Sequence, residues 1–322
     1  MTVGGHDERV HNICVIGGSR YFGRLMVERL RDAGHRVTLV NRGSAPAPAG
    51  VEHVVADRND GAGLAAALGG RTFDAVVDQV CYTPVQAAIA ARVFGGRTPR
   101  YVMASTIEVY NPAGGAPDAG PVGGLVREGA VDPAAWPVHP DRPWHDTAYL
   151  EPNYGEGKRQ TEAVLTRSGA FDFASVRCAH VLGGGAQEFT GRLAHYVERI
   201  ARGEEVAVHA EALPSVFIDY REMADVMVWA ATDAGVTGPV NACSDGLLDA
   251  RDLAGAIAGQ LGREPVYRVV PAGQEASPFS FDRHYAMSNA RARELGFAFS
   301  HADEWLNRAV AEALDAFAAS TA

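Results

Sequence analysis

Apolar positions in the first half of the chain switch between short continuous runs and helical spacing. Short apolar runs bounded by turn residues are typical of buried strands, and they cover residues 12–16, 37–40, 51–56, 73–78 and 100–105. Helical spacing separates them, as in residues 22–33 and 84–94. Strands that alternate with helices predict an α/β fold with a doubly wound parallel sheet.

A glycine pair follows the first strand, and a helical pattern begins beyond it. Gly17 and Gly18 permit a tight turn and a close approach of the backbone to a pyrophosphate, while the N-terminus of the next helix attracts negative charge. Gly23 lets that helix pack against the strand, although Arg20 stands where the usual spacing has its middle glycine. The predicted phosphate-binding residues are Gly17, Gly18, Ser19, Arg20, Tyr21, Phe22 and Gly23.

The second strand ends in Asn41 and Arg42, where NAD-binding enzymes usually place a carboxylate on the ribose hydroxyls. The guanidinium of Arg42 instead offers a planar cationic fork that suits a 2′-phosphate. The sequence therefore favours NADP(H) as the cofactor, with NAD(H) left open. The alternative is that Arg42 is a solvated residue of a turn.

The next two strands end at Asp57 and Arg58 and near Val80. Right-handed crossovers bring the carboxyl ends of parallel strands to one edge of the sheet. We therefore group all three residues with the cofactor site, with Asp57 near an adenine amino group and Val80 along the dinucleotide. Each of them is equally consistent with a turn or a packing role.

Composition and charge narrow the classes of function. A chain of 322 residues with 47% hydrophobic content can bury a large core, and its net charge of −10 gives no basic field for nucleic acid. Its apolar stretches stop well short of the ~18 residues that a membrane span needs, and the first residues are charged. We expect a cytoplasmic protein with a small-molecule substrate, no nucleic-acid or membrane partner, four reduced cysteines and no metal.

Residues with catalytic potential follow the fifth strand and open a later helix. Tyr154 and Lys158 are four residues apart, so they share a helix face and the ammonium lies near the phenol. Positive charge from Lys158 and an oxidised nicotinamide would lower the phenol pKa from ~10 toward neutrality, where it can exchange a proton with a substrate oxygen. The hydroxyl of Thr106 would orient that oxygen. Tyrosine and lysine at this spacing also occur by chance on helix surfaces.

Together these motifs resemble the extended short-chain dehydrogenase/reductase superfamily, the group of NAD-dependent nucleotide-sugar epimerases and dehydratases. The resemblance rests on the glycine turn, Tyr154 with Lys158, and segments 105–110, 176–183, 216–224 and 289–297. It implies a Rossmann core with a smaller C-terminal substrate domain. It also implies Tyr154 as acid/base, Lys158 on the nicotinamide ribose, Thr106 on the reacting oxygen, and a homodimer formed through residues 84–94 and 154–167.

Several positions depart from the family pattern. Ile107 stands where the sugar 4,6-dehydratases have an aspartate, so the catalytic candidate Glu108 lacks its acidic neighbour. The regions where relatives carry arginines for a diphosphate lack them, and Arg268 or Arg283 are candidate substitutes. His180 replaces a commonly found asparagine.

We expect residues 1–182 to form the dinucleotide-binding domain, with residues 216–260 packing back on it, and residues 183–322 to form the smaller substrate domain. The C-terminal half should contain helices at 193–200, 253–261 and 303–317 and a strand at 206–208, while the strand and helix of 216–231 should return to the main sheet. Residues 112–153, rich in Gly and Pro, form either a lid or an ordered surface loop anchored by tryptophans.

Three hypotheses for function remain open. The first is an NAD(P)-dependent oxidoreductase that moves hydride at a secondary alcohol or ketone, in epimerase-type chemistry on a sugar or sugar-nucleotide-like substrate. The second is a one-way NADPH-dependent ketoreductase of a small metabolite or natural-product intermediate. The third is a catalytically silent dinucleotide-binding protein. An epimerase regenerates its nicotinamide, whereas a reductase consumes one NADPH for each product.

Overall fold

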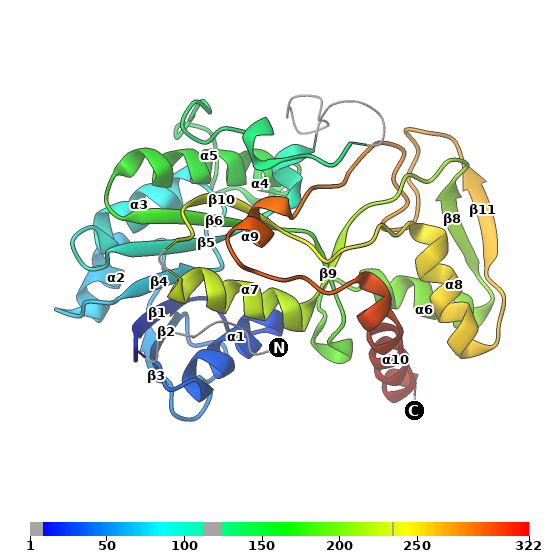
Figure 1. Cartoon of the computed structure of the whole chain (residues 1–322), viewed down its shortest axis with the longest axis horizontal. Helices are drawn as coiled ribbons and strands as arrows, with labels where there is room; N and C mark the ends of the chain where they lie inside the picture. Colours follow the sequence, from blue (N-terminus) through cyan, green and yellow to red (C-terminus); the bar gives the residue numbers. More distant parts are fainter. Residues whose placement is uncertain (1–8, 112–123, 234, 322) are drawn as a thin grey trace.

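Seven strands form one parallel sheet in the order β10-β6-β5-β4-β1-β2-β3 (Figure 1). The computed structural model describes residues 9–111, 124–233 and 235–321. The strands are β1 (Asn12–Ile16), β2 (Arg36–Asn41), β3 (Glu52–Val55), β4 (Ala75–Asp78), β5 (Arg100–Thr106), β6 (Asp172–Cys178) and β10 (Gly238–Ala242). Every neighbouring pair is parallel, which confirms the predicted doubly wound α/β fold.

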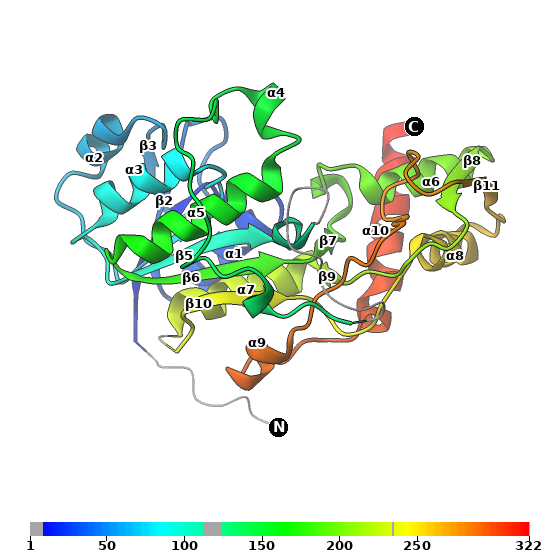
Figure 2. The same cartoon turned by 90° about the horizontal axis from the view of Figure 1, so that it is seen from above.

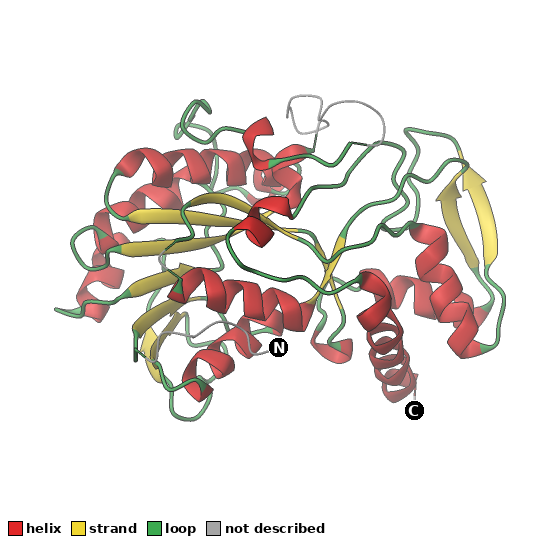
Figure 3. Cartoon of the chain, in the orientation of Figure 1, coloured by secondary structure: helices red, strands yellow, loops and turns green. Residues whose placement is uncertain are grey.

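Helices cover both faces of this sheet (Figures 2 and 3). One layer contains α1 (Tyr21–Asp32) and α7 (Tyr220–Thr232), and the other contains α2 (Gly61–Leu68), α3 (Pro84–Phe94) and α5 (Tyr154–Ser168). Helix α3 has the predicted bounds because the Thr83 side chain caps its N-terminus and the helix gives way to Gly95. Within the described ranges, no helix is both long enough and apolar enough to cross a membrane.

A second apolar core lies at the end of the molecule opposite α2 and β3 (Figures 1 and 2). It is built around α6 (Arg192–Arg202), α8 (Ala250–Leu261) and α10 (Ala302–Thr321), which pack on one another beside the parallel pair β8 (Glu205–His209) and β11 (Val266–Val270). The short helix η4 (Gly185–Gln187) packs against α10 in this half, whereas α9 (Ala290–Glu294) packs against β10 of the main sheet. We propose that α8 belongs to the second domain, and that α7 and β10 are the segments that return to the first.

The strand predicted within residues 216–231 does not join the main sheet. Strand β9 (Phe217–Asp219) instead pairs with β7 (His180–Leu182) in a separate two-stranded sheet, and only α7 returns. The strand is short because the Asp219 side chain accepts the backbone N–H of Arg221 and starts α7 at once. The seventh strand of the main sheet is β10, where Gly238 and Pro239 obscure the apolar pattern, as an edge strand tolerates.

The segment between β5 and α5 is held against α5 in its described part. It contains η1 (Ile107–Tyr110), η3 (Glu128–Ala130) and α4 (Thr147–Leu150), while residues 112–123 of the predicted loop lie outside the described residues. Trp144 is 4% exposed and donates its indole N–H to the His139 carbonyl. The Arg159 guanidinium lies 4.9 Å from the Trp136 ring centroid. For residues 124–153 this geometry favours an ordered surface loop over a lid.

A buried ion pair joins β6 to α5. Arg177 and Glu162 are both 0% exposed, and an Arg177 nitrogen lies 2.5 Å from a Glu162 carboxylate oxygen. Glu162 also accepts the hydroxyl of Ser105 on β5, and Arg177 also donates to the Tyr110 hydroxyl and to the carbonyls of Glu128 and Val131. Because these buried groups satisfy one another, the pair fixes α5 in register with the two strands beneath it.

Candidate active site

The glycine turn has the geometry that phosphate binding requires. Gly17 and Gly18 have φ values of 90° and 73°, and a Cβ on Gly18 would lie 2.9 Å from the Val15 side chain. A Cβ on Gly23 would overlap the amide group of the Gln79 side chain, so glycine leaves room for this side chain where α1 passes the end of β4. Arg20 caps α1 without a side-chain hydrogen bond, which leaves the first backbone N–H groups free to bind an anion.

The end of β2 is tied to this turn. The Asn41 side chain donates to the Ser19 hydroxyl at 2.9 Å and accepts from the backbone N–H of Gly43, and the ring of His53 lies within hydrogen-bond distance. Arg42 and Arg20 are exposed, and within the described ranges neither guanidinium has a hydrogen bond or an ion pair. The Asn41 side chain therefore stabilises the turn, whereas the guanidinium groups of Arg20 and Arg42 are available to a ligand.

The three other predicted cofactor residues differ in environment. Arg58 is 8% exposed and forms an ion pair of 2.9 Å with the fully buried Asp78, which favours its packing role. Asp57 is exposed and accepts the backbone N–H of Asn59, as in a turn. The Val80 side chain borders the glycine turn, because a Cβ on Gly17 would lie 3.0 Å from it.

The predicted catalytic residues converge where β5 and β6 end beside the N-terminus of α5. Thr106 pairs with Cys178 in the sheet register, and Thr106 is hydrogen-bonded to the Tyr154 hydroxyl. Lys158 is 1% exposed, and its ammonium donates to the Ala104 carbonyl at 2.7 Å. The ammonium lies 5.8 Å from the centroid of the Tyr154 ring. The structure thus brings Thr106, Tyr154 and Lys158 into one cluster at the carboxyl edge of the sheet.

The pKa values of this cluster differ from the expectation for the phenol. Burial, with smaller contributions from Cys178 and Tyr82, raises the pKa of Tyr154 well above its ordinary value, and the hydrogen bond from Thr106 only partly opposes this. Burial therefore outweighs the predicted lowering of the Tyr154 pKa in the protein alone, and the expected effect of an oxidised nicotinamide stays a prediction. Burial lowers the pKa of Lys158 to about 8. The phenol is protonated at neutral pH and is poised to donate.

Comparisons with known proteins bear on the fold. No family model matches the chain. The chain is similar to the Bordetella bronchiseptica enzyme WbmH in complex with NAD+, with a TM-score of 0.68 and 19% identity over 96% of this chain and 99% of that chain. It is also similar to the UDP-glucose 4-epimerase of Thermus thermophilus in complex with NAD, with a TM-score of 0.66 and 18% identity over 95% and 99% of the two chains. The chain therefore shares its fold with these two enzymes.

A curated relative is similar over a shorter stretch. The 2'-dehydrokanamycin reductase of Streptomyces kanamyceticus is 31% identical to this chain over 109 residues. The match covers 33% of this chain and 31% of the reductase, so the chain spans about a third of the length of the curated relative that it matches.

Tyr21 links the glycine turn to Gly183 and to helix α7. Its ring stacks on Tyr220 at a centroid distance of 5.5 Å, and its hydroxyl donates to the Gly183 carbonyl at 2.9 Å. Tyr21 is 5% exposed and has a φ of 51°, which is uncommon for a residue with a side chain. Its side chain is therefore used in packing, which leaves only its backbone for the predicted phosphate contact. Phe22, also predicted in this turn, is partly buried against the main core.

Glu108 lies between the catalytic cluster and the second domain. Its carboxylate accepts the side-chain N–H of Asn111 at 2.8 Å, and together with burial it raises the pKa of Tyr285. The ring of Tyr285 lies 5.3 Å from that of His180, whose pKa burial lowers to about 3. His180 is therefore a neutral side chain, enclosed by aromatic rings.

Sequence reasoning missed two signals in this site. Tyr82, a few residues after the end of β4, lies with its ring centroid 4.6 Å from the Lys158 ammonium. Its place after a strand could have grouped it with Val80. In addition, Lys158 is the only lysine among the 29 lysine and arginine residues of the chain. A sequence that otherwise uses arginine as its basic residue keeps an ammonium at this position.

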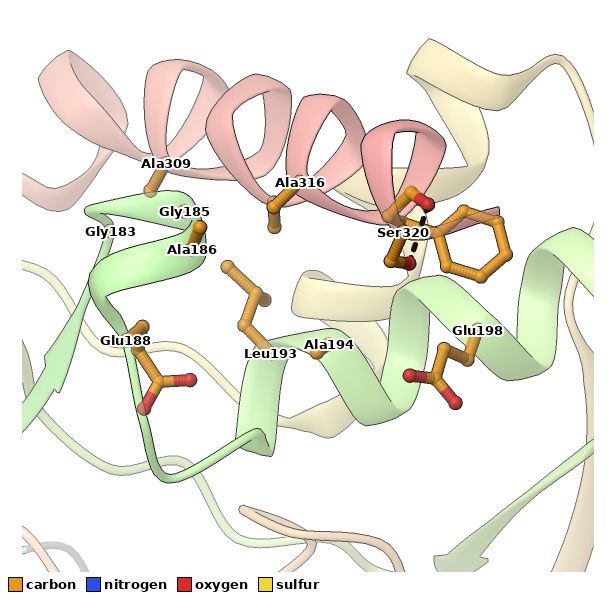
Figure 4. Close-up of a pocket in the computed structure, with 12 residues that line it drawn as sticks. Gly183, Gly185, Ala186, Glu188, Leu193, Ala194, Glu198, Ala309, Ala316 and Ser320 are labelled. Atoms are coloured by element: carbon orange, nitrogen blue, oxygen red, sulfur yellow. Dashed lines mark hydrogen bonds between the residues drawn. The ribbon is translucent and has the colours of Figure 1, made fainter. Parts of the chain in front are cut away.

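A separate groove lies in the second domain (Figure 4). It has a volume of about 140 Å³ between η4, α6 and α10, and its lining includes Ala186, Leu193 and Phe317. None of Thr106, Tyr154 and Lys158 lines this groove. The catalytic assignment rests on the cluster at the sheet edge instead.

Proposed function

We propose that this chain is an NAD(P)-dependent oxidoreductase of the extended short-chain type that transfers hydride at a secondary alcohol or ketone. The observation that carries the proposal is the convergence of Thr106, Tyr154 and Lys158 at the sheet edge that also carries the glycine turn. A catalytically silent scaffold has no chemical use for these three groups together. The fold and the partial similarity to a reductase support the same reading.

The residues of the site fit a nicotinamide dinucleotide. The free N–H groups at the start of α1 would receive the pyrophosphate, and the Lys158 ammonium would hold the hydroxyls of the nicotinamide ribose. The bound nicotinamide supplies or accepts the hydride. Thr106 orients the reacting oxygen, and Tyr154 donates a proton to it during reduction of a ketone. The raised pKa of Tyr154 keeps that proton in place at neutral pH, because a phenol loses its proton only as the pH rises through its pKa.

Two reaction types remain as proposals, and each has its own support. Epimerase-type chemistry on a sugar or sugar-nucleotide-like substrate is supported by the fold shared with UDP-glucose 4-epimerase. One-way reduction of a ketone in a small metabolite or natural-product intermediate is supported by the partial similarity to 2'-dehydrokanamycin reductase and by the protonated Tyr154. Within the described residues, Arg268 pairs with Glu205 on the exposed β8–β11 sheet, and Arg283 pairs with Asp282 and lies over the Tyr285 ring. Because Tyr285 is beside Glu108, Arg283 is the better candidate for an anionic substrate group.

The consumption of cofactor separates these reaction types. Purified protein would be incubated with NADPH and candidate substrates, with nicotinamide absorbance and product stereochemistry followed together. One NADPH consumed for each alcohol formed supports the ketoreductase. An inverted carbon with no net consumption supports the epimerase. The proposed activity is contradicted if none of the candidate ketones or sugar substrates is converted while a known ketoreductase and a known epimerase are active in the same assay.

For the cofactor, we propose a preference for NADP(H), because Arg42 and Arg20 stand exposed and unpaired beside the turn. Arg42→Ala is expected to weaken NADPH binding roughly 10- to 100-fold, the value of a charge-assisted hydrogen bond, and to change NADH binding little. Fluorescence titration with both dinucleotides measures this. Arg36→Ala is the matched control, since Arg36 is exposed at the other end of β2. Equal losses for NADPH and NADH would refute the phosphate assignment.

The homodimer remains a proposal from the family resemblance, and the cytoplasmic location remains a proposal from the short apolar stretches and the charged residues near the start of the sequence. Part of the outer face of α5, which would contribute to such a dimer, is in contact with the segment that contains Trp136 and Trp144. Light scattering of the purified protein measures its mass in solution. A dimer would have to form around this segment rather than on a bare α5.

A further inference from the structure

The environment of Lys158 contains an aromatic contact that the proposed function does not use. The ammonium is buried, and it donates a hydrogen bond to the Ala104 carbonyl at 2.7 Å. Among the ion pairs of the described residues, none includes Lys158. Two tyrosine rings flank it instead, with centroids at 4.6 Å for Tyr82 and 5.8 Å for Tyr154. The nearer ring belongs to Tyr82, which is not part of the cluster of Thr106, Tyr154 and Lys158.

Tyr82 is held rigidly in this position. Its backbone N–H donates to the Gln86 side chain at 2.7 Å, and Gln86 lies in the first turn of α3. Its carbonyl lies directly against Gly157 of α5, where a Cβ would overlap it. The backbone of Tyr82 is therefore held between α3 and α5, which places the base of its side chain beside Lys158.

The charged and titratable groups around Lys158 offset one another. Asp78 on β4 is paired with Arg58, and it also accepts the Tyr101 hydroxyl at 2.6 Å. Burial raises the pKa of the Cys81 thiol to about 12 and that of the Cys178 thiol to about 11, so both are neutral near pH 7. Tyr154 is protonated as well. The nearest source of attraction for the ammonium, besides the Ala104 carbonyl, is therefore the negative face of an aromatic ring.

We propose that Tyr82 is a positioning residue whose ring face holds the Lys158 side chain by a cation–π contact, keeping the ammonium charged and directed toward the nicotinamide ribose. This inference rests on the proposed function for the role of Lys158. Lys158 is the only lysine of the chain, and the other 28 of its 29 lysine and arginine residues are arginine (29 less one).

The single lysine makes a direct test practical. Protein grown with ¹⁵N-labelled lysine gives one side-chain NMR signal, and the pH titration of that signal measures the pKa of Lys158. The wild-type midpoint is expected near the lowered value of about 8. Tyr82→Leu removes the ring face, so the ammonium loses its proton at lower pH, with a shift of roughly one unit or tenfold in proton affinity. Tyr82→Phe keeps the ring face and is expected to titrate like the wild type.

The result that overturns the inference is a Tyr82→Leu midpoint equal to that of the wild type, or a Tyr82→Phe midpoint shifted as far as that of the leucine variant. Circular dichroism checks that each variant is folded, and Tyr82→Met is the second aliphatic variant if leucine is not accommodated. Addition of NADPH to the labelled wild type tests the proposed function separately. A lysine signal that NADPH leaves unchanged would refute the role of Lys158 at the ribose, whatever the Tyr82 variants show.

Discussion

Tyr154→Phe is expected to lower turnover roughly 10²- to 10⁴-fold, the usual contribution of a positioned general acid or base. The substitution removes the hydroxyl that is hydrogen-bonded to Thr106 and leaves the ring beside Lys158 in place. The affinity for NADPH should therefore stay close to that of the wild type. Steady-state kinetics with a converted substrate and a separate fluorescence titration with NADPH measure the two quantities.

A matched control is available for this substitution on the same side of the molecule. Tyr149 lies on α4, packs its ring at 5.4 Å from that of Trp144, and is outside the catalytic cluster. Tyr149→Phe should leave turnover unchanged. Wild-type turnover in Tyr154→Phe would contradict the assignment of Tyr154 as acid/base. Loss of NADPH affinity in that variant would indicate a structural role for the hydroxyl instead.

The second large effect concerns stability. Glu162→Gln is expected to lower the free energy of unfolding by roughly 3–5 kcal/mol, because it leaves the fully buried guanidinium of Arg177 without its countercharge. The amide cannot restore the charge, although it has nearly the same shape. Urea-induced unfolding followed by circular dichroism measures the change. The exposed pair of Arg199 and Glu204 supplies the control, and Glu204→Gln should cost less than about 1 kcal/mol.

A double variant separates the charge from the packing at this site. Replacing both partners with apolar residues, as in Glu162→Leu with Arg177→Met, removes the uncompensated charge and should recover much of the stability lost in Glu162→Gln. If the double variant is less stable than the single variant, hydrogen bonds from Arg177 to the Glu128 and Val131 carbonyls dominate. A loss below about 1 kcal/mol in Glu162→Gln would contradict the account of a buried pair.

Most of the main sheet was predictable because its signals are local. Buried parallel strands read as apolar runs, and α3 is bounded by a capping residue and a glycine that can be read from the sequence. Strand β10 was missed because Gly238 and Pro239 interrupt its apolar run. The pairing of β9 with β7 was missed because a three-residue strand carries no sign of its partner.

In the candidate active site too, features set by local sequence were predictable and long-range contacts were not. The proximity of Tyr154 and Lys158 follows from their spacing on one helix, and Thr106 follows from its place at the end of a strand. Contacts between residues distant in the sequence were not predictable, such as Tyr82 over Lys158 and Tyr21 stacked on Tyr220. Arg58 was grouped with the cofactor site because it follows a strand, but it forms a buried ion pair with Asp78. The sequence alone does not distinguish an arginine in a buried ion pair from one that binds a ligand.

The central claim is that this protein binds and uses a nicotinamide dinucleotide. The most direct measurement is the ultraviolet spectrum and mass of any dinucleotide released when the purified protein is denatured, followed by titration of the refolded or fresh protein with NADPH and NADH. The account predicts binding of one nicotinamide dinucleotide per chain, either already held or taken up on titration, with NADPH bound more tightly than NADH. Protein that releases no dinucleotide and binds neither NADPH nor NADH would contradict the account.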